Sequence, residues 1–338
     1  MMYHRMLWLL MMTTHYSKLT SINAYSSDSN VLPRSLHTLP MIVTPDTFTD
    51  TINSLPDSPM WIMDVETNGF DPYNMNQLCG IGLADLDSEH AYYFPFRHQS
   101  DEPNLSQDQL KRLVEFINNT CKTVVGYNVK FDAKFLHNEG INIDAMKLLD
   151  VLVMVRMTEP TTINRLSLTD TLVRSYGEKA GAYDLETKKV LKKNKWFRDF
   201  SLAPPSILGP YCIDDVKWTR KLYKDRFRKL VTSNQIELFH FQTKLTKTLY
   251  MMERRGVVID NKYAKQAYDK TLTRIEVLKN RIYELVGHEF NISSTKQLGE
   301  TFNAMGVHSP LRTAKGAEAW NEEALVRLNS PLAGLVRQ

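Results

Sequence analysis

Acidic side chains recur in three short clusters that lie far apart along the chain. The clusters are Asp64 with Glu66, Asn128 with Asp132, and Tyr211 with Asp215. Residues two apart share one face of a strand, and residues four apart share one face of a helix. One strand and two helices would therefore aim four carboxylates at one point. A cluster of carboxylate oxygens binds divalent metal ions, and two such ions bound side by side typically act on the phosphate groups of a substrate.

The elements that position these clusters can be read from hydrophobic periodicity. The apolar run at residues 60–63 predicts a buried strand that ends at Asp64. Ionised carboxylates are costly there unless they are paired or bound to metal. Further strands are expected at residues 41–43, 78–86, 91–96 and 123–126. Helices are expected at residues 106–118, 129–138, 146–157, 167–176, 210–230, 236–255 and 261–286.

Composition is that of an ordinary globular protein. The chain has 338 residues, 43% hydrophobic and 24% charged, which is enough for about two domains. A net charge of +4 is compatible with nucleic acid but is too weak to argue for it alone. Three cysteines without a C-x-x-C spacing indicate reduced thiols of an intracellular protein. No apolar run approaches the roughly 18 residues of a membrane span, so we expect no membrane partner.

Residues 1–40 differ from the rest of the chain. A short apolar run at residues 6–12 follows two polar residues, and no acid occurs before Asp28. Organellar targeting is an alternative, but Arg5 and Lys18 are the only strong bases before Asp28. We therefore expect a disordered extension, or an upstream start with Met41 as the true first residue, in a cytoplasmic protein. For a phage protein this means the host cytoplasm.

Three motifs together resemble the DnaQ-like (DEDD) 3′–5′ exonucleases. Residues 64–69 (DVETNG) are similar to the first motif of that superfamily, and residues 126–132 (GYNVKFD) to the second, N-x-x-x-D. Residues 211–215 (YCIDD) resemble the third motif, Y-x-x-x-D, of the tyrosine subgroup. Each motif alone is weak. All three in this order and at these spacings are specific.

Downstream segments narrow the resemblance to family A DNA polymerases of the bacterial and phage polymerase I type. Residues 252–260 (MERRGVVID) resemble the segment that joins the proofreading domain to the thumb. Residues 290–299 (FNISSTKQLG) resemble the tip of the thumb, and residues 331–337 (PLAGLVR) the approach to the palm. The palm and fingers motifs are absent, so we expect no polymerase activity from this chain alone. A palm and fingers part encoded downstream is an expected partner.

The resemblance implies both a fold and a domain plan. It implies an α/β fold, a ribonuclease H-like mixed sheet flanked by helices, followed by a mainly α-helical partial thumb. The corresponding domains are residues 41–232 for the exonuclease and residues 233–338 for an incomplete thumb, after the extension at residues 1–40.

The resemblance also implies the chemistry. Two divalent ions, Mg²⁺ or Mn²⁺, would be the cofactors, with Asp64 bridging them and Glu66 and Asp215 completing the ion that holds the attacking water. Asp132 would serve the second ion through water, and Tyr211 would orient the attacking water. The substrate would be a single-stranded or frayed 3′ end of DNA, released as 5′-monophosphates.

Substrate contacts are expected from side chains around this centre. Phe70 occupies the position where the family wedges an apolar side chain between terminal bases, although an ordinary loop aromatic is an alternative. Thr67, Tyr127 and Tyr183 are further candidates. Asn128 is a candidate too, but we expect it to cap its helix. The basic run at residues 188–195 either follows the DNA backbone or is a solvated loop.

Two other functions remain open at this stage. The chain could be an RNA-end exonuclease of the same superfamily, although the thumb-like tail argues against that. It could also be a catalytically silent DNA-binding module, although the complete set of carboxylates argues against that. Cleavage assays on DNA and RNA with and without metal distinguish the three.

Overall fold

The computed structural model describes residues 41–338. The extension expected at residues 1–40 lies outside the described residues. The described chain divides into two compact units, and the division falls between Arg255 and Gly256. In this described part, we find no helix that is both long and apolar enough to cross a membrane.

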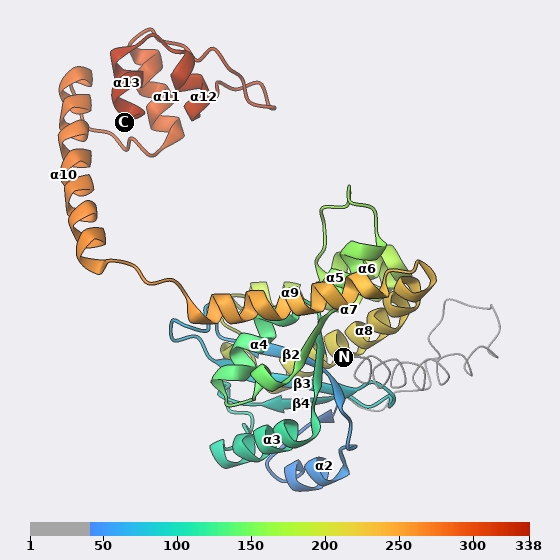
Figure 1. The fold of residues 1–338 in the computed structure, drawn as a ribbon. Helices are drawn as coiled ribbons and strands as arrows, with labels where there is room; N and C mark the ends of the chain where they lie inside the picture. The colour runs from blue at the N-terminus through green and yellow to red at the C-terminus, as the bar shows by residue number, and fades with distance from the viewer. Residues whose placement is uncertain (1–40) are drawn as a thin grey trace. The chain divides into compact units, whose positions relative to one another are not determined.

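A six-stranded mixed sheet forms the centre of the first unit (Figure 1). Its order is β1-β4-β3-β2-β5-β6, with β2 antiparallel to β3 and β3 antiparallel to β4. The other neighbours are parallel. The strands are β1 (Met41–Ile42), β2 (Met60–Thr67), β3 (Leu78–Asp85), β4 (Tyr92–Pro95), β5 (Thr123–Gly126) and β6 (Lys147–Asp150).

Helices cover both faces of this sheet, as Figure 1 shows. They are α2 (Phe48–Ser54), α3 (Gln107–Thr120), α4 (Val129–Asn138), α5 (Val151–Thr158), α6 (Leu168–Tyr176), α7 (Glu178–Lys193), α8 (Pro205–Thr232) and α9 (Ile236–Arg255). This architecture confirms the predicted α/β fold with a mixed sheet flanked by helices.

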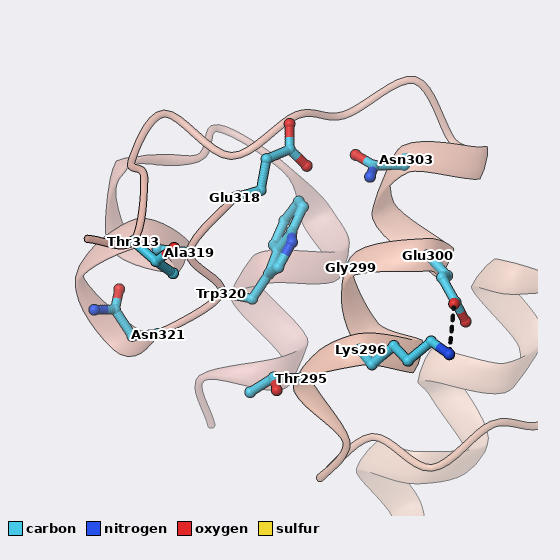
Figure 2. Close-up of a pocket in the computed structure, with 10 residues that line it drawn as sticks. All are labelled: Thr295, Lys296, Gly299, Glu300, Asn303, Thr313, Glu318, Ala319, Trp320 and Asn321. Carbon is cyan, nitrogen blue, oxygen red and sulfur yellow. Dashed lines mark ion pairs between the residues drawn. The ribbon is translucent and has the colours of Figure 1, made fainter. Parts of the chain in front are cut away.

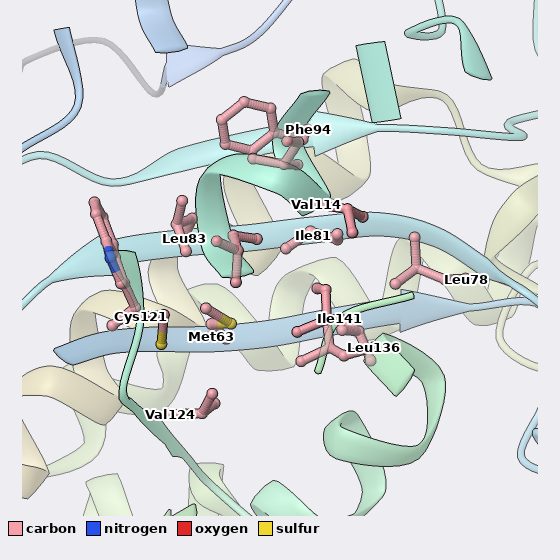
Figure 3. Close-up of a cluster of buried hydrophobic side chains, with 14 of the residues drawn as sticks. Met63, Leu78, Ile81, Leu83, Phe94, Val114, Cys121, Val124, Leu136 and Ile141 are labelled. Atoms are coloured by element: carbon pink, nitrogen blue, oxygen red, sulfur yellow. The ribbon is translucent and has the colours of Figure 1, made fainter. Parts of the chain in front are cut away.

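Alternation along β2 separates the hydrophobic core from the functional face. Trp61, Met63 and Val65 enter the core that the sheet shares with α3 and α4, part of which Figure 3 shows. Ile62 enters the second core, which contains side chains of α5, α6 and α8. Because successive side chains of a strand point to opposite faces, Asp64 and Glu66 lie on the Ile62 side of the sheet.

Three local predictions were wrong. Residues 146–157 were expected to be one helix, but they form β6 followed by α5, because a short apolar run does not separate a strand from a helix. The helix expected from residue 210 begins at Pro205 and contains Pro210. The basic run at residues 188–195, for which a solvated loop was one of two interpretations, lies mostly within α7.

The first unit extends past residue 232, where the exonuclease domain was expected to end. Helix α9 follows that residue and packs on the same sheet-and-helix body. Its Phe239 is buried in the α8-side core, and its Tyr250 is buried in the core on the other side of the sheet. The physical boundary between the units therefore follows α9 instead of preceding it.

The second unit is built from α10 (Asn261–Val286), α11 (Thr295–Ala304), α12 (Glu322–Arg327) and α13 (Pro331–Val336). Its small core includes Ile282, Phe302 and Leu332, and the Trp320 ring stacks on Phe302 with 4.8 Å between ring centroids. Beside Trp320 lies a cavity of about 570 Å³, where Lys296 pairs with Glu300 (Figure 2). None of the site residues expected from the sequence lines this cavity.

Candidate active site

Two glycines on β3 lie directly opposite the carboxylates of β2. In the antiparallel register Asp64 pairs with Gly82, and Glu66 pairs with Gly80. A Cβ atom placed on Gly82 would lie 2.6 Å from Cys212 Sγ, well inside van der Waals contact. The absence of that Cβ therefore lets α8 approach the sheet closely. It is this close approach that carries the α8 residues to the β2 carboxylates.

Asp132 reaches the same place from the first turn of α4. The residue before that helix, Asn128, has a left-handed backbone with φ of 65°, and its N–H donates to Asp150 Oδ1 at 2.9 Å. This turn aims α4 so that Asp132 Oδ1 accepts a hydrogen bond from the Val65 N–H at 3.3 Å. Asp132 is thus tied to the strand between Asp64 and Glu66.

Helix α8 contributes the third set of side chains. Its thiol at Cys212 donates to Asp64 Oδ2 with 3.6 Å between sulfur and oxygen. Asp215 lies one turn further along and is partly exposed. Tyr211 precedes Cys212, is buried, and forms a T-shaped ring pair with Phe200, with 6.5 Å between ring centroids.

The four carboxyl groups share one electrostatic environment. Burial raises the pKa of Asp64 to about 7. Burial, followed by the charges of Asp64, Asp215 and Asp132, raises the pKa of Glu66 well above its ordinary value. The pKa values of Asp132 and Asp215 are raised well above normal for the same two reasons, and after burial the charge of Asp64 has the largest effect in each case. The sequence-predicted carboxylates therefore lie in one neighbourhood.

Two carboxylate oxygens in this neighbourhood are buried without any hydrogen-bond partner. They are Glu66 Oε1 and Asp132 Oδ2. Such atoms are expensive to leave unsatisfied, and a bound cation would satisfy both. Ligand atoms of Asp64, Glu66 and Cys212 also lie within 4.8 Å of one another. The donor set, rich in hard carboxylate oxygens, fits a divalent ion such as Mg²⁺ or Mn²⁺.

Tyr211 is held as a neutral phenol. Burial is the main reason that its pKa lies well above the ordinary value, and the charges of Asp215 and Glu66 add to the effect. At neutral pH its hydroxyl therefore keeps its proton and can donate a hydrogen bond. It is not suited to act as a base.

Helix α7 brings a further acid and a lysine to the edge of the site. Asp184 is buried, accepts a hydrogen bond from Thr169 and pairs with Lys188 at 2.8 Å. Asp184 raises the pKa of Asp215, whereas Lys188 opposes that rise. Lys188 therefore acts within the protein as a counter-charge and lies on a helix instead of a loop, whereas a DNA contact by the basic run stays a prediction.

The expected substrate contacts divide into exposed and internally bonded residues. Phe70 is 74% exposed in the loop between β2 and β3, and Tyr183 is 46% exposed on α7. The Thr67 hydroxyl donates to the Gly69 carbonyl at 2.6 Å, which fixes the loop that carries Phe70. The Tyr127 hydroxyl donates to the Leu166 carbonyl at 2.7 Å and is thereby committed to the fold.

Asn128 does not cap α4 in the way we expected. It occupies the N-cap position, but its side chain makes no capping hydrogen bond. The reason is its left-handed backbone, which Asn adopts more readily than most residues. Its exposed side chain stays available to a substrate, and its backbone sets the direction of α4.

Sequence reasoning missed several residues that build the site. Cys212 lies inside the third motif, directly after Tyr211, but a lone cysteine carries no signal by itself. Gly80 and Gly82 alternate along a predicted strand, which indicates close backbone approach and could have identified them. Asp150 ends an apolar run in the same way as Asp64, but the incorrect helix prediction concealed it.

Comparison with known proteins places this geometry in a family. The 3′-5′ exonuclease family of DNA polymerase A matches residues 39–231. DNA polymerase I of Synechocystis sp. is 31% identical over 72% of this chain and 24% of its own length. DNA polymerase I of Borreliella burgdorferi is 27% identical over 79% of this chain and 28% of its own. DNA polymerase DpoZ of Vibrio phage phiVC8 is 26% identical over 82% of this chain and 46% of its own length.

The chain thus spans between about a quarter and a half of the length of these relatives. Among solved structures, the POL domain of Pol1 from M. smegmatis, in complex with DNA primer-template and dNTP, superposes with a TM-score of 0.55. That match covers 88% of this chain and 47% of the other at 14% identity, so it shows a shared fold.

Proposed function

From the premise that this chain belongs to the DNA polymerase A family of 3′-5′ exonuclease domains, we propose that it removes 3′-terminal nucleotides from single-stranded DNA and releases 5′-monophosphates. The observation that carries the proposal is the convergence of Asp64, Glu66, Asp132 and Asp215, with two buried carboxylate oxygens left unpartnered. A structural ion-pair network would supply positive partners at these positions, whereas Lys188, which offsets the charge of Asp215, forms its ion pair with Asp184.

Asp64, Glu66, Asp132 and Asp215 would hold two divalent ions, Mg²⁺ or Mn²⁺. When bound, such ions supply an activated water and charge relief on the leaving 3′ oxygen. Burial of Glu66 and Asp132 keeps bulk water from competing for the ligand oxygens. The Val65 N–H donates to one oxygen of Asp132, and the other oxygen is buried without a hydrogen-bond partner, so it could bind an ion.

Tyr211 would position the attacking water or a phosphate oxygen. Its raised pKa keeps the hydroxyl protonated, so the hydroxyl donates a hydrogen bond and takes no proton. Packing against Phe200 fixes the ring and limits the loss of entropy when the hydroxyl engages the substrate. The expected signature is a lower rate without an altered metal requirement when the hydroxyl is removed.

Recognition of the 3′ end would depend on stacking more than on base identity. The exposed Phe70 ring presents a face to a terminal base, and such stacking contributes about 1–3 kcal/mol per base. Thr67 would act by holding that loop, and Tyr183 and Asn128 would offer exposed contacts to the strand. Tyr127 remains a weaker candidate because its hydroxyl is bonded within the protein.

The domain plan rests on the resemblance and stays a prediction. In it, residues 41–232 form the exonuclease and residues 233–338 belong to a polymerase thumb, with a palm and fingers part as the partner. A cytoplasmic location is predicted on the same ground.

The decisive experiment is a cleavage time course on a 5′-labelled single strand. The proposal expects a ladder of shortened DNA only with Mg²⁺ or Mn²⁺, loss of the ladder with a chelator, and slower cleavage of the matched RNA. The Asp64→Asn variant should be inactive, and Asp101→Asn, an exposed acid outside the site, should cleave as the wild type does. Preferred cleavage of RNA, or binding of DNA without cleavage, would overturn the proposal.

A further inference from the structure

One thiol lies among the site carboxylates. Cys212 Sγ is fully buried and lies 3.6 Å from Asp64 Oδ2. The family motif explains Tyr211 and Asp215 on either side of it, but the proposed hydrolysis has no use for a sulfur atom. Because thiols are poor ligands for Mg²⁺ and Mn²⁺, the sulfur gives this site a chemistry that its carboxylates alone lack.

The geometry suits a softer ion. One ligand atom each from Asp64, Glu66 and Cys212 lies within 4.8 Å of the other two. A tetrahedral Zn²⁺ ion with bonds of about 2.3 Å to sulfur and about 2.0–2.2 Å to oxygen holds two ligands about 3.7 Å apart. Side-chain rotations that bring the ligand atoms up to about 1 Å closer therefore place all three on one ion. Glu66 Oε1, which is buried and has no hydrogen-bond partner, is a second, independent observation that fits a bound cation.

We propose that Asp64, Glu66 and Cys212 form a site for a thiophilic divalent ion, Zn²⁺ or Cd²⁺, that excludes the hard catalytic ion and inhibits hydrolysis. The inhibition rests on the proposed function, but ion binding does not. As the sulfur–metal bond forms, the thiol proton passes to bulk water, because a coordinating thiol is deprotonated outright. Solvent reaches the site at Asp64 and Asp215, both partly exposed.

Binding is tested by titrating the metal-free full chain with Cd²⁺ and recording the thiolate-to-cadmium charge-transfer absorption in the ultraviolet. We expect saturation near one equivalent. The band should disappear in Cys212→Ser and weaken in Asp64→Asn, which keeps every thiol. The matched control is Cys121→Ser. Cys121 is also buried and free, but its thiol donates to the Thr123 carbonyl inside the opposite core, so its loss should leave the band unchanged.

Inhibition is tested separately with Mg²⁺ at a fixed concentration and increasing Zn²⁺, each variant being compared with its own rate without Zn²⁺. Cys212→Ser should raise the half-inhibiting Zn²⁺ concentration at least about tenfold, the equivalent of about 1.4 kcal/mol. A cadmium band that survives in Cys212→Ser, or that is indifferent to Asp64→Asn, would overturn the site. Unchanged Zn²⁺ inhibition in Cys212→Ser would overturn its role as an inhibitory site, whereas absence of nuclease activity with the band intact would count against the proposed function alone.

Discussion

Replacing Asp64 by Asn should make the metal-free protein more stable while it removes activity. Burial raises the pKa of Asp64 to about 7 from an ordinary value of 3.8. A carboxyl group whose pKa is raised in the folded state stabilises that state fully below the ordinary pKa, and this contribution is lost as the pH rises through about 7. At pH 8 the folded wild type therefore bears the cost of an ionised carboxylate, which an amide avoids.

The size of the effect follows from these values. At 1.36 kcal/mol per pH unit, the rise from 3.8 to about 7 corresponds to about 4 kcal/mol. Because solvent reaches the partly exposed side chain, about 2 kcal/mol is the expected gain. For a body of 150–250 residues this raises the melting temperature by about 4–8 °C. Saturating Mg²⁺, at about 100 times its dissociation constant, should stabilise the wild type by about 2.7 kcal/mol and the variant hardly at all.

Calorimetry at pH 8 should thus show the variant melting above the wild type in chelator and losing that lead in Mg²⁺. Nuclease activity should fall about 10³-fold, because the variant loses a metal ligand that lowers the activation free energy by several kcal/mol. Asp101→Asn, at an exposed site, should change stability by less than about 0.5 kcal/mol in either buffer. If Asp64→Asn destabilises the metal-free protein, the ionised Asp64 carboxylate does not destabilise the folded wild type. If the variant keeps the Mg²⁺ response, Asp64 is not a metal ligand.

Three further outcomes are expected. Phe70→Ala should raise KM on short single strands about tenfold, the equivalent of about 1.4 kcal/mol of stacking, and leave the Mg²⁺ dependence unchanged; equal KM values would make Phe70 an ordinary loop aromatic. Gly82→Ala should cost about 1–3 kcal/mol in denaturant unfolding, because its Cβ would meet Cys212 Sγ at 2.6 Å; Gly334→Ala, with open space at the Cβ, is the control, and equal losses would refute the close approach of α8. The apparent dissociation constant for Mg²⁺ should rise as the pH falls from 8 to 6, because protons compete for Asp64 near pH 7; a flat profile measured by calorimetric titration would contradict this.

The motif residues show which parts of the candidate site could be predicted from the sequence. Asp64 and Glu66 were predictable because an apolar run followed by alternating acids carries the period of a strand. Asp132 and Asp215 were predictable because their helices carry both a four-residue spacing and a family motif. The mixed sheet and its flanking helices were expected from the family resemblance. These signals are local, so they can be recognised in the amino-acid sequence without the structure.

Tertiary structure decided which features of those elements matter. The sequence alone indicated the family and the α/β fold, and it predicted the four carboxylates whose role as metal ligands stays a proposal. Only the folded chain showed that Gly82 admits α8, that Asp150 sets the direction of α4, and that Cys212 Sγ lies against Asp64. Each of these depends on contact between residues many positions apart, across strands and helices whose approach is set by packing. Sequence periodicity predicts which side chains share one face of a strand or helix. How closely two such faces approach each other is set by the packing of the folded core.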